Sequence, residues 1–368
     1  MRKVRAGIIG CGNISEKYID NLTNLFENTE VIAVTDIISE AAEKRAKQFG
    51  IPHVCKTNDE LLELPEVEIV VVLTNPGQHF NVCEASLLAG KHTYVEKPLS
   101  LGTDDAKRLL ELANEKGLML SSAPDTILGS SMQTARKLID DGWIGKPIAA
   151  ISHILTGGPE SWHPSPAFLY HIGAGPLFDV APYYVAGLTY LLGPVDNVMC
   201  SAKITYKERT ITSQPLYGTK INVEVPTYIA GILNMSNGVI ASIHHSFDVN
   251  DTKLDNSVEI YGTEGTIVIP TPCGFSGDIW FKKKTIDEWS KIPCIFQYKD
   301  DTRGVGVADM AAALLENRSQ RLSKEFGYHT LEVLEQLDNS SKFKKVCNIE
   351  SSFERTEPMK TVTGWSKQ

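Results

Sequence analysis

The sequence predicts two domains of different architecture in one chain. Over residues 1–123 we expect an α/β domain with a parallel sheet, because short apolar runs alternate there with stretches of helical spacing. Over residues 124–368 we expect an α+β domain with a large, mostly antiparallel open sheet, because strand-like runs follow one another with Gly and Asn turns between them. A chain of 368 residues that is 42% hydrophobic is sufficient for both cores.

The elements of the first domain follow from the spacing of apolar residues. Val4–Ile9 reads as a buried strand at the start of the domain. Ile69–Leu73 is almost purely β-branched, as expected of a strand that is buried on both faces. The remaining predicted elements are strands at Val31–Thr35 and His92–Val95 and helices at Ser15–Leu25, Phe80–Leu88 and Ala106–Ala113.

The second domain combines several strands with a few helices. A helix at Met132–Ile139 and the turn Gly142–Pro147 lead into it. Near its end, a helix at about 328–340 is expected to pack back on the first domain, and Trp365 is expected to dock although the residues after Glu350 are polar. The other predicted elements are strands at Ala149–Leu155, Tyr228–Leu233, Val239–Phe247, Val258–Tyr261 and Thr266–Ile269 and helices at Pro182–Leu192 and Val307–Glu316.

Composition excludes several classes of protein. The net charge of -9 with scattered Lys and Arg argues against a nucleic-acid partner. No segment approaches the roughly 18 continuous apolar residues of a membrane span, and the N-terminus lacks the pattern of a signal peptide. The 7 cysteines are odd in number and widely spaced, as buried thiols of a reducing compartment would be. We therefore expect a cytoplasmic protein with a small-molecule partner.

A glycine-rich turn joins the first strand to the first helix. In Gly10–Ser15, the first glycine allows a tight turn, and Gly12 lets the backbone approach a pyrophosphate at the helix N-terminus. Ser15 occupies the third position, where a small residue still permits close packing. The alternative is a turn without a ligand. In its context the turn predicts a dinucleotide-binding Rossmann domain, with contacts from Gly10, Cys11, Gly12, Asn13 and Ile14.

Asp36 ends the second predicted strand. A carboxylate there accepts hydrogen bonds from the adenosine ribose and repels a 2′-phosphate. Ile37, Ile38 and Ser39 follow, so no Arg stands ready to hold that phosphate. NAD is therefore favoured over NADP; the alternative is a solvated Asp at the end of a strand.

Lys97 follows the predicted strand His92–Val95, where an open α/β sheet carries its chemistry. Together with the glycine turn, Glu96-Lys97-Pro98 resembles the Gfo/Idh/MocA oxidoreductases, the glucose-fructose oxidoreductase and inositol dehydrogenase family. The resemblance covers nearly the whole chain. It implies that Glu96 and Lys97 lie at the cofactor, with a cis bond before Pro98. It implies further cofactor contacts from Thr74, Asn75, Pro76, His79 and Trp162.

The resemblance also assigns chemistry to Lys97. A neutral amine would take the proton of a secondary alcohol, and an ammonium would polarise the carbonyl in the reverse reaction. Desolvation beside the positive nicotinamide ring would lower the pKa of this amine. The alternative is an exposed Lys that happens to follow a strand.

Asp179 and Tyr183 match the second catalytic segment of the family, within Gly173–Tyr184. Relatives usually carry His four residues after the Asp; here Tyr, with an ordinary pKa near 10, takes its place. Asp179 could instead serve only as a helix N-cap. The segment is similar to a branch that acts on sugars and glycosides, including oxidation of glucosides at C3.

Further pocket residues are expected in the loop before this segment. His163, Tyr170 and His171 are candidates to hold a sugar together with Lys97, Asp179 and Tyr183. The alternative is a rigid Pro-rich loop with incidental His. A metal site from His153, His163, His171 and Asp179 lacks any short ligand spacing, so no metal is expected.

The function favoured by these residues is hydride transfer between a secondary alcohol of a sugar or glycoside and NAD. Two alternatives stay open: reduction of a keto-sugar with NAD(P)H, and a non-catalytic nucleotide sensor on the same fold. The resemblance implies pairing through the open face of the second sheet, where strands such as Ala149–Leu155 and Val239–Phe247 would otherwise leave an apolar face exposed. A homodimer or homotetramer is therefore expected.

Overall fold

The computed structural model describes residues 2–367, which form two compact units. Unit 1 contains the residues up to Ser130, Phe296–Leu331 and the residues from Thr356 onward. Unit 2 contains Ser131–Ile295 and Glu332–Arg355. The domain boundary at residue 123 and the packing of the late helix on the first domain stay predictions.

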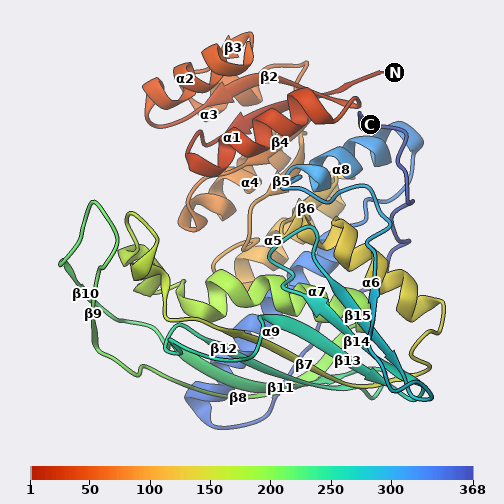
Figure 1. Ribbon diagram of the computed structural model, residues 1–368. Coiled ribbons are helices and arrows are strands. Elements are labelled where there is room, and N and C mark those ends of the chain that lie inside the picture. Colours follow the sequence, from red (N-terminus) through yellow and green to blue (C-terminus); the bar gives the residue numbers. More distant parts are fainter. Residues whose placement is uncertain (1, 368) are drawn as a thin grey trace. The chain divides into compact units, whose positions relative to one another are not determined.

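Unit 1 is built on a six-stranded parallel sheet with the order β3-β2-β1-β4-β5-β6 (Figure 1). Its central strand β4 is Ile-Val-Val-Val and fully buried, as the β-branched run predicted. The predicted α/β architecture is thus confirmed. The strands are β1 (Val4–Ile9), β2 (Thr29–Thr35), β3 (His53–Val54), β4 (Ile69–Val72), β5 (His92–Val95) and β6 (Leu120–Ser122).

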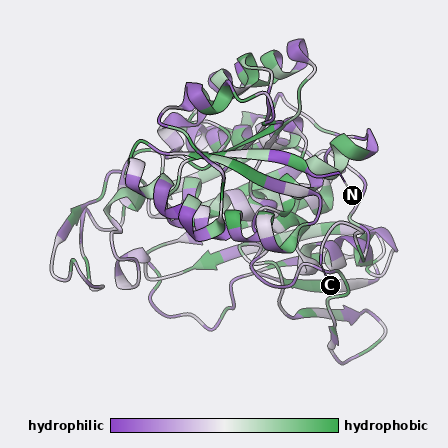
Figure 2. Cartoon of the chain, turned by 90° about the horizontal axis from the view of Figure 1, so that it is seen from above, coloured by the Kyte–Doolittle hydropathy of each residue, from purple (hydrophilic) through white to green (hydrophobic). Residues whose placement is uncertain are grey.

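Amphipathic helices connect the strands of unit 1. In Figure 2 the helices carry hydrophilic and hydrophobic segments in alternation, which matches one face on the sheet and one in water. The predicted helix Ser15–Leu25 is in fact α1 (Asn13–Asp20) followed by a π-helical turn, Asn21–Leu25. The other helices are α2 (Ser39–Phe49), α3 (Asn58–Leu62), α4 (His79–Leu88), α5 (Thr103–Lys116) and α8 (Val305–Glu316), with 3₁₀ turns at Pro76–Gln78 and Asp125–Leu128.

The C-terminal segment completes the packing of unit 1. Trp365 is 6% exposed and stacks on Tyr298, with ring centroids 5.8 Å apart. The Trp365 carbonyl accepts the Glu27 N–H at 2.9 Å, and the Lys367 N–H donates to the Leu25 carbonyl at 2.9 Å. The docking of Trp365 is therefore confirmed, and its partners lie beside the start of β2.

Unit 2 is built on a nine-stranded sheet with the order β16-β15-β14-β13-β7-β12-β11-β8-β17. Only β7 and β12 pair in parallel, which confirms a mostly antiparallel sheet. The strands are β7 (Pro147–Leu155), β8 (Val195–Lys203), β11 (Tyr228–Met235), β12 (Ile240–Ser246), β13 (Ser257–Gly262), β14 (Gly265–Pro270), β15 (Ile279–Lys283), β16 (Ser290–Ile292) and β17 (Cys347–Asn348), and a separate hairpin joins β9 (Glu208–Thr210) to β10 (Lys220–Asn222).

One face of this sheet is covered by α7 (Ala181–Leu192), which is apolar and almost wholly buried. The Tyr184 ring lies 5.0 Å from the His245 ring on β12, which places α7 on that face. The remaining helices are α6 (Ser130–Asp140) and α9 (Lys324–Phe343). Between residues 2 and 367, no helix combines the length and the apolar character needed to cross a membrane.

Candidate active site

Four predicted site residues of unit 1 follow the carboxyl ends of parallel strands. Gly10 follows β1, Asp36 follows β2, Thr74 comes shortly after β4, and Lys97 comes shortly after β5. Strand β4 lies between β1 and β5, and β2 pairs with the other side of β1. Because all of these strands are parallel, the four residues share one edge of the sheet, the edge at which open α/β sheets bind ligands.

The glycine turn has the geometry that a dinucleotide requires. Gly10 has φ +103°, and a Cβ there would lie 2.7 Å from the Leu73 carbonyl oxygen, so no larger residue fits. At Gly12 an added Cβ would meet nothing within 4 Å. No side chain caps α1 at Gly12, which leaves the first-turn N–H groups for an external acceptor.

Asp36 is tied to the same turn by its carboxylate. Oδ2 accepts the Cys11 N–H at 2.6 Å, and Oδ1 accepts the Ile38 N–H at 2.8 Å. Burial is the first cause that raises the pKa of the Cys11 thiol to about 12, followed by the charge of Asp36. Cys11 therefore contributes its backbone to this turn, while its thiol stays protonated.

Glu96 is held from two directions at the end of β5. It accepts the Tyr18 hydroxyl at 2.7 Å through Oε1 and the Lys97 N–H at 3.0 Å through Oε2. The Lys97–Pro98 peptide bond is cis, as the resemblance implied. The Lys97 backbone is therefore fixed by its own neighbours in unit 1.

His79 is fully buried between the two loops after β4 and β5. Its Nδ1 lies 2.6 Å from the Pro98 carbonyl and its Nε2 3.0 Å from the Thr74 carbonyl. Burial lowers the pKa of His79, and a neutral imidazole donates to only one of the two carbonyls. The structure thus places the ring inside unit 1, whereas Asn75 and Pro76 are exposed. The Thr74 hydroxyl is buried and finds no partner among the described residues.

Asp125 is a second buried carboxyl group in unit 1. Its Oδ2 accepts the N–H groups of Gly304 at 2.7 Å and Gly306 at 3.2 Å. Burial, and then the charge of Glu96, raise the pKa of Asp125 to about 7. This carboxyl lies at the start of α8.

In unit 2, Asp179 lies in a π-helical turn, Pro176–Val180, and Tyr183 lies in the first turn of α7. Val180 occupies the N-cap of α7, without a side-chain cap bond, and Gly175 occupies the N-cap of the preceding turn. N-capping therefore does not explain Asp179. Both candidate side chains are half-buried.

The loop before this turn carries an aromatic group. Trp162 is 70% exposed, and its ring centroid lies 5.5 Å from that of His163. The His163 ring packs against Phe168 at 5.4 Å, and its Nδ1 accepts the Ser165 N–H at 3.0 Å. His171 is exposed and lies 3.0 Å from the Glu224 carboxylate. Of these, Trp162 presents the largest free ring surface.

Tyr170 is the one candidate of this loop that is fully buried. Its hydroxyl donates to the Glu160 carboxylate, and the Arg209 guanidinium lies 5.4 Å from its ring centroid. Its ring packs in a small apolar cluster that includes Phe247. The structure thus places Tyr170 in the support of the loop rather than on its surface.

Comparison with known proteins identifies the group to which these strand-end residues belong. Residues 4–123 match the oxidoreductase family with an NAD-binding Rossmann fold, and residues 132–268 match the GFO/IDH/MocA C-terminal domain. The chain belongs to the Gfo/Idh/MocA family. The resemblance seen in the sequence is thereby confirmed, and so is NAD as the cofactor.

Individual members of the Gfo/Idh/MocA family are similar over most of the chain. The myo-inositol 2-dehydrogenase of Thermotoga maritima is 22% identical over 265 residues, 72% of this chain and 74% of that protein. A dTDP-3,4-didehydro-2,6-dideoxy-alpha-D-glucose 3-reductase of Saccharopolyspora spinosa is 26% identical over 328 residues, 85% and 92% of the two chains. The solved structure of levoglucosan dehydrogenase in complex with NADH has a TM-score of 0.82 at 18% identity, over 95% of this chain and 100% of that chain.

The residues of unit 1 fit the cofactor of this family. The open space above Gly12 admits a pyrophosphate, and the fixed Asp36 carboxylate suits the ribose hydroxyls. The Thr74 hydroxyl is available to form hydrogen bonds with the cofactor. Across residues 2–367, no group of three or more His, Cys, Asp and Glu side chains is arranged to hold a metal ion.

Two supporting arginines escaped prediction from the sequence. The buried Arg45 on α2 donates through Nε to the Ser15 hydroxyl at 3.2 Å and pairs with Glu16 through Nη1 at 2.6 Å. Arg45 thereby places a cation behind the glycine turn of this Gfo/Idh/MocA protein. Its helical spacing alone resembles that of an ordinary surface residue, so only the fold reveals its position.

The second arginine, Arg209, organises the loop that carries Trp162. It pairs with the carboxylates of both Glu160 and Asp248, and all three side chains are largely buried. It also donates to the Gly157 carbonyl at 3.0 Å and the Phe247 carbonyl at 2.8 Å. We call Tyr170, Glu160, Arg209 and Asp248 the Arg209 cluster.

Proposed function

We propose that the protein is an NAD-dependent dehydrogenase that oxidises a secondary alcohol of a sugar or glycoside. The observation that carries the proposal is the shared strand edge of Gly10, Asp36 and Lys97 in unit 1. Bound there, NAD supplies the acceptor for the hydride. The chain itself must then supply a base for the hydroxyl proton.

Lys97 is the proposed base. In its neutral form the amine takes the proton from the substrate hydroxyl while the C–H bond gives up its hydride, and in the reverse direction the ammonium returns that proton. The support is structural: Glu96 fixes the Lys97 N–H, and Tyr18 in turn fixes Glu96. The backbone that carries this amine is therefore held in place before substrate arrives.

Asp179 and Tyr183 are proposed to hold and exchange protons with the substrate hydroxyls. Their roles rest on the match to the family's second catalytic segment and on the failure of N-capping to explain Asp179. Trp162, His163 and His171 are proposed to line the sugar site, with Trp162 offering an apolar face to a ring. Tyr170 is proposed to act through the loop, by way of the Arg209 cluster.

The decisive test is a Lys97→Ala variant measured beside Lys97→Arg. We expect Lys97→Ala to lose turnover by about 10²–10⁴-fold, the contribution of a positioned acid or base, while NADH binding stays close to that of the parent. Lys97→Arg keeps a cation that does not deprotonate, and is expected to be nearly as inactive. Full activity of either variant would rule out Lys97 as the base.

The substrate class is tested by NAD reduction across inositols, free sugars and O- and C-glucosides. We propose glycosides, with C3 of a glucoside as the first position to examine. The Saccharopolyspora relative supports a second candidate, reduction of a keto-sugar, because its name describes such a reaction. NADH would be oxidised when members of a keto-sugar panel are added. This result, together with no reduction of NAD by any alcohol, would favour that candidate.

A homo-oligomer through the sheet of unit 2 is part of the proposal. The face of this sheet opposite α7 exposes apolar side chains in one row across several strands, with Ser242 and Glu259 between them. In this row Ile232 on β11 pairs with Met199 on β8, and their side chains are 41% and 50% exposed. Ile151 and Trp280, on β7 and β15, are 37% and 40% exposed. Light scattering should detect a dimer or tetramer, and Ile232→Lys should weaken it.

A further inference from the structure

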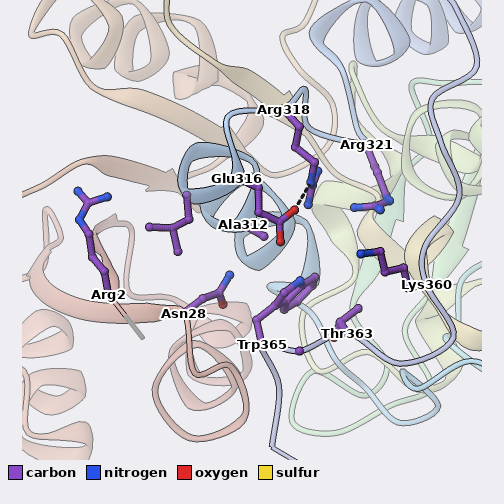
Figure 3. A pocket seen from close by; sticks show the side chains of 11 residues that line it. Arg2, Asn28, Ala312, Glu316, Arg318, Arg321, Lys360, Thr363 and Trp365 are labelled. Atoms are coloured by element: carbon purple, nitrogen blue, oxygen red, sulfur yellow. Dashed lines mark hydrogen bonds and ion pairs between the residues drawn. The ribbon is translucent and has the colours of Figure 1, made fainter.

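A pocket of about 370 Å³ lies in unit 1, at the opposite end of the parallel strands from the glycine turn (Figure 3). Asn28, which directly precedes β2, and Arg2, which precedes β1, belong to its wall. Gly10 and Asp36 follow the other ends of the same strands. Since β1 has 6 residues, the two sites are about 20 Å apart.

The floor of the pocket is apolar. It contains Ala312 and Leu315 from α8 and Trp365 from the C-terminal segment. The indole stacks on Tyr298, and only its remaining exposed part, 6% of the side chain, faces the pocket. A cavity of this size with a flat aromatic wall is suited to a small molecule that carries a ring.

The rim of the pocket is cationic. The lining contains Arg2, Arg318, Arg321 and Lys360 and one acidic residue, Glu316. Arg2 pairs with Glu68 and Arg318 pairs with Glu316, so the positive charge of these two arginines is partly offset. This excess is notable in a chain with a net charge of -9. In Figure 3 the side chains of Arg321 and Lys360 extend toward Trp365 from the same side.

The positions of these cations have a structural cause. The buried Asp309 on α8 accepts the Arg321 N–H at 2.7 Å and Arg318 Nη2 at 2.8 Å, and it also pairs with the Arg321 guanidinium. Two guanidinium groups thus share one buried carboxylate. The Lys360 ammonium forms no ion pair with any residue from 2 to 367. An anion in the pocket would balance this charge.

Asn28 supplies a second, independent observation. Its Nδ2 donates to the Ala308 carbonyl at 2.8 Å, which fixes the orientation of the carboxamide. Its Oδ1 receives no hydrogen bond from any described residue, and Asn28 is buried, with 0% exposure. A buried acceptor without a partner costs stability, and a ligand hydroxyl or N–H would satisfy it.

We propose that this pocket binds a small organic anion: a phosphate monoester or a carboxylate joined to a flat ring that carries a hydroxyl or N–H donor. The ring lies on Trp365, the anion meets Lys360 and Arg321, and the donor meets Asn28. The site is separate from the edge of the sheet that is assigned to NAD, so its occupancy does not depend on the proposed reaction.

The probes are 4-hydroxybenzoate and 4-hydroxyphenyl phosphate, with 4-hydroxybenzyl alcohol as the uncharged counterpart. Binding is measured by isothermal titration calorimetry on the full chain with saturating NAD. The bound NAD prevents the phosphate probe from binding at the dinucleotide site. We expect at least one anion to bind about ten-fold more tightly than the alcohol. The preferred anion tells a carboxylate site from a phosphate site.

Two matched variants locate the binding. Lys360→Glu is expected to weaken the anion about ten-fold, whereas Lys299→Glu, an equal charge change on an exposed residue of unit 1 outside the pocket, changes it less than about two-fold. Leu315→Trp is expected to fill the cavity and abolish binding. Circular dichroism and the unfolding temperature establish that each variant is folded.

The proposal is overturned by any of three results. One is the absence of heat for both anions at about 5 mM, where a millimolar Kd would register. Another is equal weakening by Lys360→Glu and Lys299→Glu, since the effect would then come from net charge. The third is unaltered binding in a folded Leu315→Trp variant, which would place the anion elsewhere.

Discussion

Both units bury carboxyl groups, and those of the Arg209 cluster in unit 2 are compensated differently from Asp125 in unit 1. In unit 2 the carboxylates of Glu160 and Asp248 share the guanidinium of Arg209. In unit 1 the Asp125 carboxyl is held by two backbone N–H groups and no ion pair to it occurs among the described residues. The carboxylates of the Arg209 cluster are balanced by a guanidinium, as Asp309 of unit 1 also is, whereas Asp125 is held mainly by peptide dipoles.

The difference decides what each group can do. A buried ion pair fixes geometry, and here it fixes the loop that carries Trp162. The Asp125 carboxyl is stabilised by two backbone N–H groups and, more weakly, by the charge of Arg303. It can lose or gain its proton near neutral pH, as its raised pKa of about 7 indicates. The Arg209 cluster is therefore a structural support, and Asp125 is a group that titrates.

The largest expected effect is the loss of the Arg209 cation. Arg209→Met leaves two buried carboxylates without their partner, so the free energy of unfolding should fall by about 3–5 kcal/mol. Urea unfolding measures this change. The matched control is Lys220→Met in the neighbouring strand β10, whose ion pair with Glu208 is exposed and whose loss should cost about 0–1 kcal/mol. Equal effects of the two substitutions would contradict the role of the Arg209 cluster.

The second effect concerns the pH dependence of stability. The Asp125 pKa rises from 3.8 unfolded to about 7 folded, so between these values the folded state keeps a proton that the unfolded state has lost. The stability contributed by this group is complete below about pH 4 and is lost as the pH rises through about 7. In Asp125→Asn no carboxyl group titrates at this position, so the free energy of unfolding no longer falls for this reason.

The unfolding free energy of Asp125→Asn, relative to the parent, should therefore rise by on the order of 2–4 kcal/mol between about pH 4 and about pH 8. Urea unfolding at several pH values gives the difference. Asp287→Asn, at an exposed position, is the control and should show no slope. A flat difference for Asp125→Asn would show that the two N–H groups hold the pKa near its ordinary value.

The third effect separates folding from binding within the glycine turn. Gly10→Ala places a methyl group against the Leu73 carbonyl at a positive φ and should cost about 1–3 kcal/mol of stability. Gly12→Ala meets no atom of the chain within 4 Å, so it should leave the cofactor-free unfolding temperature unchanged while weakening NADH. Thermal unfolding and NADH titration together check the pair. Unaltered NADH affinity in Gly12→Ala would place the pyrophosphate elsewhere.

The smallest effect concerns the choice between NAD and NADP. Asp36→Asn keeps an oxygen that accepts one of the two backbone N–H groups but removes the charge that repels a 2′-phosphate. The ratio of NADPH to NADH dissociation constants should fall about ten-fold, which is about 1.4 kcal/mol. Fluorescence titration of both cofactors measures it, and an unchanged ratio would show that another group sets the preference.

The sequence was sufficient wherever a site depends on local features. Gly10, Asp36 and Lys97 each follow a strand that its own apolar run reveals, so the strand edge of unit 1 could be predicted in advance. The helix at Ser15–Leu25 was predicted as a single α-helix, and the π-helical turn at its end has no signature in the spacing.

Sites that depend on distant residues were missed. The Arg209 cluster joins Glu160, Arg209 and Asp248 from three separate segments. Their spacing in the sequence therefore does not predict that they are in contact. The strand Val195–Lys203 was also missed, because Asp, Asn, Ser and Lys interrupt its apolar alternation although its inward residues are buried. The proposal that Tyr183 transfers protons in place of the usual His stays a prediction, because this role involves contact with a substrate.

The docking of Trp365 has a consequence for the order in which the chain acquires its structure. The base of the parallel sheet in unit 1 packs against residues that are synthesised more than three hundred positions after β1. During synthesis, the C-terminal segment becomes available to unit 1 only after all residues of unit 2 have been added. Until that point the aromatic surface of Phe26 and Tyr298 lacks the cover that Trp365 gives it, and we expect a nascent chain to be more open to chaperones and proteases there.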